Sequence, residues 1–288
     1  MARARLKGLE TEYEAFGRPA DPALLLIAGL GSQLTWWPTE FCAQLAECGY
    51  RVVRFDNRDC GLTVNVGPVP PRVRVAGVRR PPYLMPDLAE DAVGLLDALE
   101  IEAAHVVGAS MGAMIAQQLT IDHPSRVLSL CSIMSRPGDR ASGRTQPKVD
   151  EFLMNRPGEG RERVVDAGVA FGEIIASPDH PMDPAERRAE VAAAYDRAYR
   201  PDGLLRQLSA IYGSPDRTEG LRSVAVPTLV VHGEQDPLVN ADGGRATAAA
   251  VPGARLWLVP GMGHDLPRPL WPALVAAITA NAAARRQD

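Results

Sequence analysis

Short apolar runs along this chain are each followed by a turn signal and then by a helix-like stretch. Three such runs lie in the first half of the chain, at Ala23 to Ala28, Arg51 to Phe55 and Ala104 to Val107. This alternation is the one expected of a parallel β-sheet with helices on its faces. The sequence therefore predicts an α/β fold.

The same rhythm predicts most of the remaining elements. One helix opens at Pro86 and runs to about Leu99, and another runs from Met111 to about Asp122. Further strands are expected at Val127 to Ile133, Val226 to Val231 and Ala254 to Val259, and further helices at Ala241 to Ala250 and Leu270 to Ala284. Glu12 to Phe16, before the first apolar run, is predicted as part of an antiparallel edge strand.

The pattern changes from about Pro137 to Leu221, where proline pairs break the chain and Ala185 to Tyr199 forms an Ala/Arg/Glu-rich helical stretch. Since the α/β rhythm resumes afterwards, this segment is predicted as an insertion within one domain. The core domain is then residues 1–136 and 221–288, and the insertion is residues 137–220. Val64 to Pro82 is irregular and long for a loop, which favours a functional or mobile segment.

Composition excludes several classes of function. The formal net charge is −4 and no long block of like charges occurs, so nucleic acid is not an expected partner. The longest apolar run is far shorter than a membrane span, and no export signal follows Met1, so neither a membrane role nor secretion is expected. Cys42, Cys48, Cys60 and Cys131 form no CxxC pair and no metal-ligand spacing, which favours reduced thiols in a cytoplasmic protein. The oligomeric state does not follow from the sequence.

No cofactor site is expected either. Gly29-Leu30-Gly31 follows a predicted strand, as a dinucleotide-binding loop would, but Leu34 stands where the third glycine of GxGxxG belongs. The sequence therefore predicts neither an organic cofactor nor a metal.

Gly108-Ala109-Ser110-Met111-Gly112 lies between a predicted strand and a predicted helix. This is the context of a nucleophile elbow, in which a sharp turn exposes the serine hydroxyl and a Cβ in place of either glycine would crowd the strand or the helix. The helix N-terminus that follows favours a developing anion. We therefore predict Ser110 as a nucleophile.

A serine needs a base, and that base needs an orienting acid. Asp236 and His264 each lie just past the end of a predicted strand, where α/β active sites gather. They give the chain order Ser, Asp, His described for this geometry. Glu234, on the same loop as Asp236, is the main rival acid, and Asp265 is a weaker one because its place beside His264 gives poor geometry.

The other histidines have plainer interpretations. His232 is predicted as a structural residue at a strand end, and His105, His123 and His180 as solvated or hydrogen-bonded side chains. The tetrahedral oxyanion also needs donors. We expect these to be the main-chain N–H groups of Met111 and Leu30. The less favoured alternative for the loop at Leu30 is a tight strand-to-helix turn and nothing more.

The chain resembles the serine α/β-hydrolase superfamily over essentially its whole length. The matching pieces are Gly29-Leu-Gly31, Asp56-Asn-Arg-Asp-Cys-Gly61, Gly108-Ala-Ser-Met-Gly112, Val226-Pro-Thr-Leu-Val-Val-His-Gly-Glu-Gln-Asp236 and Pro260-Gly-Met-Gly-His264. Within the superfamily, Trp37-Pro38, Asn57-Arg58-Asp59 and Pro260 to Pro267 look most like methyl esterases that act on aclacinomycin-type anthracyclines. Many relatives have His-Gly at the oxyanion loop, where this chain has Ala28-Gly29.

This resemblance implies an α/β-hydrolase fold with a mostly parallel sheet, a helical cap over residues 137–220, and a carboxylic ester as the small-molecule substrate. Haloalkane dehalogenases and epoxide hydrolases share the framework but use a carboxylate nucleophile, which Ser110 replaces here. The expected reaction is ester hydrolysis through an acyl-enzyme, without a cofactor. Cleavage of a C–C bond or an amide by the same triad, and ligand binding without catalysis, remain alternatives. Aromatic residues of the insertion could line an apolar pocket or simply pack together: Phe152, Phe171, Tyr195, Tyr199 and Tyr212.

Overall fold

A single eight-stranded sheet lies at the centre of the computed structural model, which describes residues 1–6, 8–64, 81–154 and 159–284. The strand order is β1-β2-β4-β3-β5-β6-β7-β8. The strands are β1 (Ala2–Leu6), β2 (Leu9–Phe16), β3 (Ala23–Ile27), β4 (Arg51–Phe55), β5 (Ala104–Ala109), β6 (Val127–Ile133), β7 (Thr228–Gly233) and β8 (Arg255–Val259). In this spatial order, the neighbouring strands from β4 through β3 to β8 are all parallel, whereas β1–β2 and β2–β4 are antiparallel. The predicted α/β fold is confirmed.

The predicted edge strand at Glu12 to Phe16 is wrong in one respect. These residues belong to β2, which is antiparallel as expected but lies between β1 and β4 and is therefore not at the edge. The edge strand at this end of the sheet is β1, whose sequence Ala-Arg-Ala-Arg-Leu exposes both of its arginines. So short and polar a strand carries little apolar signal, because only one face of an edge strand reaches the core.

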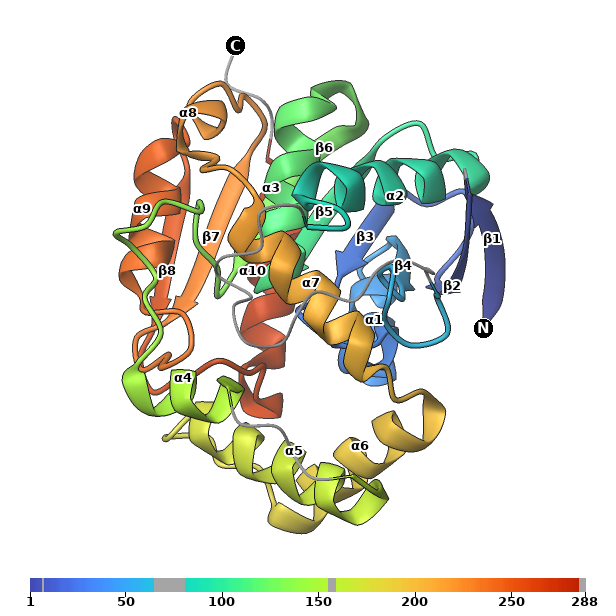
Figure 1. Ribbon diagram of the computed structural model, residues 1–288. Coiled ribbons are helices and arrows are strands. Elements are labelled where there is room, and N and C mark those ends of the chain that lie inside the picture. The colour runs from blue at the N-terminus through green and yellow to red at the C-terminus, as the bar shows by residue number, and fades with distance from the viewer. Residues whose placement is uncertain (7, 65–80, 155–158, 285–288) are drawn as a thin grey trace.

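Helices cover both faces of the sheet (Figure 1). Those outside residues 137–220 are α1 (Thr39–Glu47), α2 (Met85–Ala98), α3 (Met111–Asp122), α9 (Asp242–Ala250) and α10 (Trp271–Ala282), with short 3₁₀ turns at Leu34–Trp36, Pro124–Arg126 and Arg268–Leu270. Leu25 and Ile27 of β3 pack with α2 and α3, whereas Leu24 and Leu26 pack with α1 and α10. The alternation of side chains along one strand thus supplies both layers of the core.

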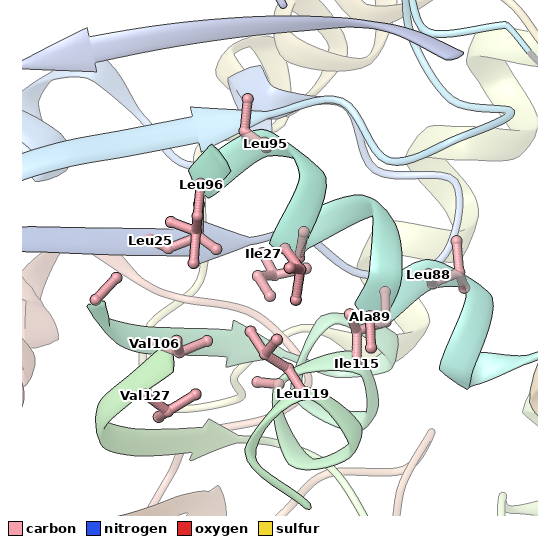
Figure 2. Packing of buried hydrophobic residues seen from close by; sticks show 14 of the residues in the cluster. Leu25, Ile27, Leu88, Ala89, Leu95, Leu96, Val106, Ile115, Leu119 and Val127 are labelled. Atoms are coloured by element: carbon pink, nitrogen blue, oxygen red, sulfur yellow. The ribbon is translucent and has the colours of Figure 1, made fainter. Parts of the chain in front are cut away.

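Figure 2 shows the first of these layers, where Leu88 and Leu96 of α2 and Ile115 of α3 pack around Ile27 and its neighbours. All four side chains are at most 1% exposed. Burying a leucine or isoleucine fully contributes about 1.5–3 kcal/mol, so this layer is a main source of stability.

Residues 137–220, which we call the insert, contain α4 (Pro147–Met154), α5 (Arg161–Ile175), α6 (Pro184–Arg197), α7 (Pro201–Gly213) and most of α8 (Thr218–Leu221). Helices α4, α5 and α6 lie beyond the arrowheads of β7 and β8 in Figure 1, and α7 crosses in front of the sheet. Two buried carboxylates in the turn after β4 hold the insert: Asp56 pairs with Arg197 at 2.9 Å and Asp59 with Arg206 at 2.7 Å.

None of the helices in the described part of the chain combines the length and apolarity that a membrane-spanning segment requires. The predicted irregular segment Val64 to Pro82 falls mostly on residues 65–80, which lie outside the described residues.

The turn from β5 into α3 depends on two glycines. A Cβ at Gly108 would lie 2.2 Å from the carbonyl oxygen of Gly112, and a Cβ at Gly112 would lie 2.1 Å from the carbonyl oxygen of Ile27. Both contacts are with backbone, which cannot move aside as a flexible side chain can. The absence of a Cβ at these positions therefore lets α3 start directly against β3 and β5.

We predict that Gly112→Ala lowers the free energy of unfolding by about 2–3 kcal/mol, because the added methyl group overpacks a backbone contact. The matched control is Gly94→Ala in α2, where the nearest atom to an added Cβ is 3.6 Å away. This control should be neutral or should stabilise by up to about 1 kcal/mol, since alanine has the higher helix propensity. Urea unfolding of both variants checks this, and equal effects would contradict the close approach.

Candidate active site

Ser110 sits on the turn between β5 and α3 with a φ of 57° and a ψ of −120°, a conformation that is strained for any residue except glycine. Its N–H donates to the carbonyl of Ile133 at 2.9 Å, and its carbonyl accepts the Ser135 hydroxyl at 2.8 Å. Bonds to the end of β6 and to the residues just after it therefore hold the strained turn, and the side chain of Ser110 points into a cavity.

His264 and Asp236 lie beside this serine. The Nε2 atom of His264 is 3.0 Å from Ser110 Oγ, and its Nδ1 atom is 2.6 Å from Asp236 Oδ2. Asp236 follows β7 and His264 follows β8, so the carboxyl ends of neighbouring parallel strands bring them together. The structure thus unites the three side chains that the sequence predicted.

Asp236 is buried, and its carboxylate is fully hydrogen-bonded. Oδ1 accepts the main-chain N–H groups of Leu238 at 2.9 Å and Val239 at 2.8 Å, while Oδ2 faces His264. Burial by itself would raise the pKa of Asp236, but the charges and hydrogen bonds of His264 and His232 outweigh it and lower the pKa to about 2. This carboxylate is therefore ionised at neutral pH and can orient and stabilise an imidazolium.

The rival acids lie elsewhere. Glu234 is exposed, and its main-chain N–H donates to the carbonyl of Val259. Asp265 bonds to Ser177 of the insert through the Ser177 N–H and hydroxyl. Neither carboxylate has a hydrogen bond to the His264 ring within the described chain, which leaves Asp236 as the partner of the imidazole.

His232 adds a contact that the sequence did not reveal. Its Nε2 donates to the carbonyl of Val239 at 2.8 Å and lies 3.4 Å from Asp236 Oδ2. Because a carbonyl can only accept, the proton is on Nε2, and the buried Nδ1 atom has no hydrogen-bond partner among the described residues. The predicted structural histidine thus also supports the carboxylate of Asp236. The sequence signal that could have indicated this contact is the position of His232 four residues before Asp236.

Of the other histidines, His105 contacts Ser129 at 2.9 Å and His123 contacts Glu90 at 2.7 Å, both away from Ser110. His180 lies in the turn after Ser177, where its main-chain N–H donates to the Ser177 carbonyl. A metal site is not evident: the described residues contain no cluster of three or more His, Cys, Asp or Glu side chains able to hold an ion.

The loop after β3 passes close to the serine. A Cβ at Gly29 would lie 3.3 Å from Ser110 Cβ, and Leu30 lines the same cavity as Ser110 and His264. Met111 is the first residue of α3, where main-chain N–H groups have no acceptor within the helix. Both predicted oxyanion donors therefore belong to backbone that borders Ser110, and their role stays a prediction.

The cavity has a volume of about 500 Å³, and residues of the insert form a large part of its lining. All five aromatic residues that the sequence singled out in the insert line it, and Phe152 stacks on Phe171 as Tyr195 stacks on Tyr199. Trp36 also lines the cavity, whereas Trp37 is fully buried in the core. An apolar compartment thus lies directly over the serine hydroxyl.

Comparisons with known proteins identify the family of this chain. Residues 22–267 match the family model described as alpha/beta hydrolase fold. Rhodomycin D methylesterase DnrP of Streptomyces peucetius is 30% identical over 290 residues, covering 93% of each chain. Putative carbamate hydrolase RutD of Klebsiella pneumoniae (strain 342) is 30% identical over 258 residues, covering 85% of each chain.

Among solved structures, the enol-lactonase from Burkholderia xenovorans LB400 aligns with a TM-score of 0.74 and 21% identity, over 98% of this chain and 100% of that one. At this identity the likeness shows the fold alone. The family match spans most of the chain and includes the strand-turn-helix at Ser110, Asp236 and His264. The chain belongs to the alpha/beta hydrolase fold family.

Proposed function

We propose that this protein is a serine hydrolase that cleaves a carboxylic ester, such as a methyl ester or another small or polyketide-like ester, through an acyl-enzyme. The observation that carries the proposal is the unbroken hydrogen-bonded line from Ser110 Oγ through His264 to Asp236. The choice of an ester as the bond that is cleaved is supported by the relatives that are named methylesterases.

In the proposed mechanism, His264 takes the proton of Ser110 as Oγ attacks the ester carbonyl carbon. Asp236 holds the ring so that Nε2 faces the serine, and it stabilises the imidazolium that forms. The tetrahedral intermediate collapses when the alcohol leaves with the proton from Nε2. Water, deprotonated by the same nitrogen, then attacks the acyl-enzyme and releases the acid.

The oxyanion of each tetrahedral intermediate is held by the N–H groups of Leu30 and Met111, next to the positive end of α3. The core domain is residues 1–136 and 221–288, and the insert acts as a helical cap. Its aromatic side chains line the cavity in which the ester would bind.

Labelling with a fluorophosphonate tests the nucleophile. We predict one adduct on the wild-type protein, none on Ser110→Ala, and labelling of His264→Ala that is slower by at least about 10³-fold, because the hydroxyl has lost its base. The mass of the intact protein measures each adduct. If folded wild-type protein gives no adduct, ligand binding without catalysis becomes the better description.

Replacing Asp236 by Asn tests the orienting acid. The amide oxygen keeps the N–H groups of Leu238 and Val239, which turns the NH₂ group toward His264 Nδ1. The ring is then held in the wrong tautomer and its imidazolium is not stabilised, so kcat should fall by about 10³–10⁴-fold with little change in KM. The matched control is Glu234→Gln on the same loop, which should keep kcat within about twofold because the Glu234 side chain is exposed. Similar losses in the two variants would reject the assignment of Asp236.

The apolar cavity predicts the response to acyl chain length. For 4-nitrophenyl esters, kcat/KM should rise by about tenfold from acetate to butyrate, because two further methylene groups are each worth about 0.8 kcal/mol when buried. A vinylogous diketone and a proline arylamide, assayed beside the esters, test C–C and amide cleavage. Faster turnover of either would overturn the proposal of an ester substrate while leaving the serine mechanism intact.

A further inference from the structure

The loop that carries His264 is fastened to the insert. The main-chain N–H of His264 donates to the carbonyl of Ile175, the last residue of α5, at 2.7 Å. Two residues further along the insert, Ser177 bonds to both neighbours of the histidine: its hydroxyl accepts the N–H of Gly263 at 2.9 Å and donates to the carboxylate of Asp265. The histidine is therefore bracketed on both sides.

Ser177 is well suited to this contact. It is 1% exposed, so neither of its bonds competes with water. A hydroxyl has a single hydrogen to donate, and Ser177 gives it to Asp265, which also accepts the Ser177 N–H at 3.1 Å. The hydroxyl and main chain of one buried serine thus join the residue before His264 to the residue after it.

Backbone packing makes the contact tight. A Cβ at Gly263 would lie 2.5 Å from the carbonyl oxygens of both Ile175 and Ala176, so the end of α5 presses directly on the histidine loop. Two residues after Ser177, the N–H of Asp179 donates to the carbonyl of Gly261 at 3.3 Å. Any displacement of the end of α5 would therefore be passed to the backbone that carries the imidazole.

The same helix borders the cavity. The compartment above Ser110 is lined by Gly168, Phe171 and Ile175 of α5. The carbonyl of Ile175 also accepts the N–H of His264. A substrate that packs against α5 thus contacts the element that fixes the position of the base.

We propose that Ser177 and Asp265 are positioning residues that couple the insert to His264, holding the imidazole in reach of Ser110 through the end of α5. This inference rests on the proposed function, in which His264 is the base. The two residues touch neither the substrate nor the reacting atoms, and they act by fixing the loop. A misplacement of about 1 Å at a reacting group can reduce the rate by about 10²-fold, so a small shift of the loop is enough to matter.

The test compares two serines that join the insert to the core. The hydroxyl of Ser214, at the end of α7, accepts the N–H of Met85 at 2.9 Å and donates to the carbonyl of Ala210 at 2.7 Å. Ser177→Ala and Ser214→Ala thus each remove two hydrogen bonds of one hydroxyl, but only Ser177 contacts the histidine loop. Thermal unfolding of both variants shows how much stability each loses.

We predict that Ser177→Ala slows fluorophosphonate labelling of Ser110 and lowers kcat by about 10–100-fold, with KM changed by less than about threefold. Ser214→Ala should keep both rates within about twofold at the same folded fraction. Asp265→Ala should match Ser177→Ala, whereas Asp265→Asn should recover most of the activity, because an amide oxygen still accepts from Ser177. Equal rates in Ser177→Ala and Ser214→Ala would overturn the coupling.

A second measurement does not need turnover. The short hydrogen bond from His264 Nδ1 to Asp236 should give a downfield proton resonance, which is lost in His264→Ala. In the coupled arrangement this resonance broadens or disappears in Ser177→Ala and persists in Ser214→Ala, and its persistence in both would overturn the coupling even for a protein that shows no hydrolysis. Absence of labelling in the wild type would instead count against the proposed function alone.

Discussion

The close approach of three backbone segments at Gly108 and Gly112 is the constraint on which the rest of the site depends. Because no Cβ separates α3 from β3 and β5, the chain passes from strand to helix through one residue, Ser110. A serine does not favour this backbone conformation, and hydrogen bonds to Ile133 and Ser135 stabilise it. The strain places the hydroxyl at the N-terminus of α3, and the loops after β3, β7 and β8 all converge on that point.

Buried carboxylates organise the loops around the serine, and each has its charge balanced locally. Asp236 is compensated by His264, by His232 and by two main-chain N–H groups. Asp56 accepts the N–H of Leu34 at 2.7 Å as well as pairing with Arg197 of the insert. Removing one partner would leave an uncompensated buried charge, which is strongly destabilising. The loop after β3 and the docking of the insert are therefore parts of one ionic arrangement, which links the loop of Leu30, one of the proposed oxyanion donors, to the insert.

The sequence predicted the parts of this molecule that are encoded locally. Ser110, Asp236 and His264 each follow an apolar strand. Because β5, β7 and β8 run parallel, their carboxyl ends bring the three side chains to the same edge of the sheet. The contacts that the sequence missed join residues far apart in the chain: Ser177 to Asp265, and Gln207 to the N–H of Gly31 at 2.8 Å. Asp265 could be dismissed as the orienting acid from its position beside His264, but its true partner lies in the insert, where periodicity carries no information about docking. Strand β1 was also missed by the sequence analysis. An edge strand needs little apolar surface, so the exposed arginines of β1 gave it no apolar pattern.

The insert contacts both halves of the proposed machinery. Gln207 of α7 accepts the N–H of Gly31 beside the oxyanion loop, while Ser177 brackets the base. Two of the aromatic residues that line the cavity, Phe171 and Tyr212, lie in α5 and α7 themselves. Residues proposed to contact substrate and residues that hold the reacting loops therefore share these two helices. A change in the insert that reshapes the cavity must keep both attachments, or the hydroxyl and imidazole lose their alignment. Under the proposed mechanism, selectivity and rate are for this reason physically linked. A substitution at Phe171 or Tyr195 that disturbs α5 or α6 would then act on kcat through loops that neither side chain belongs to.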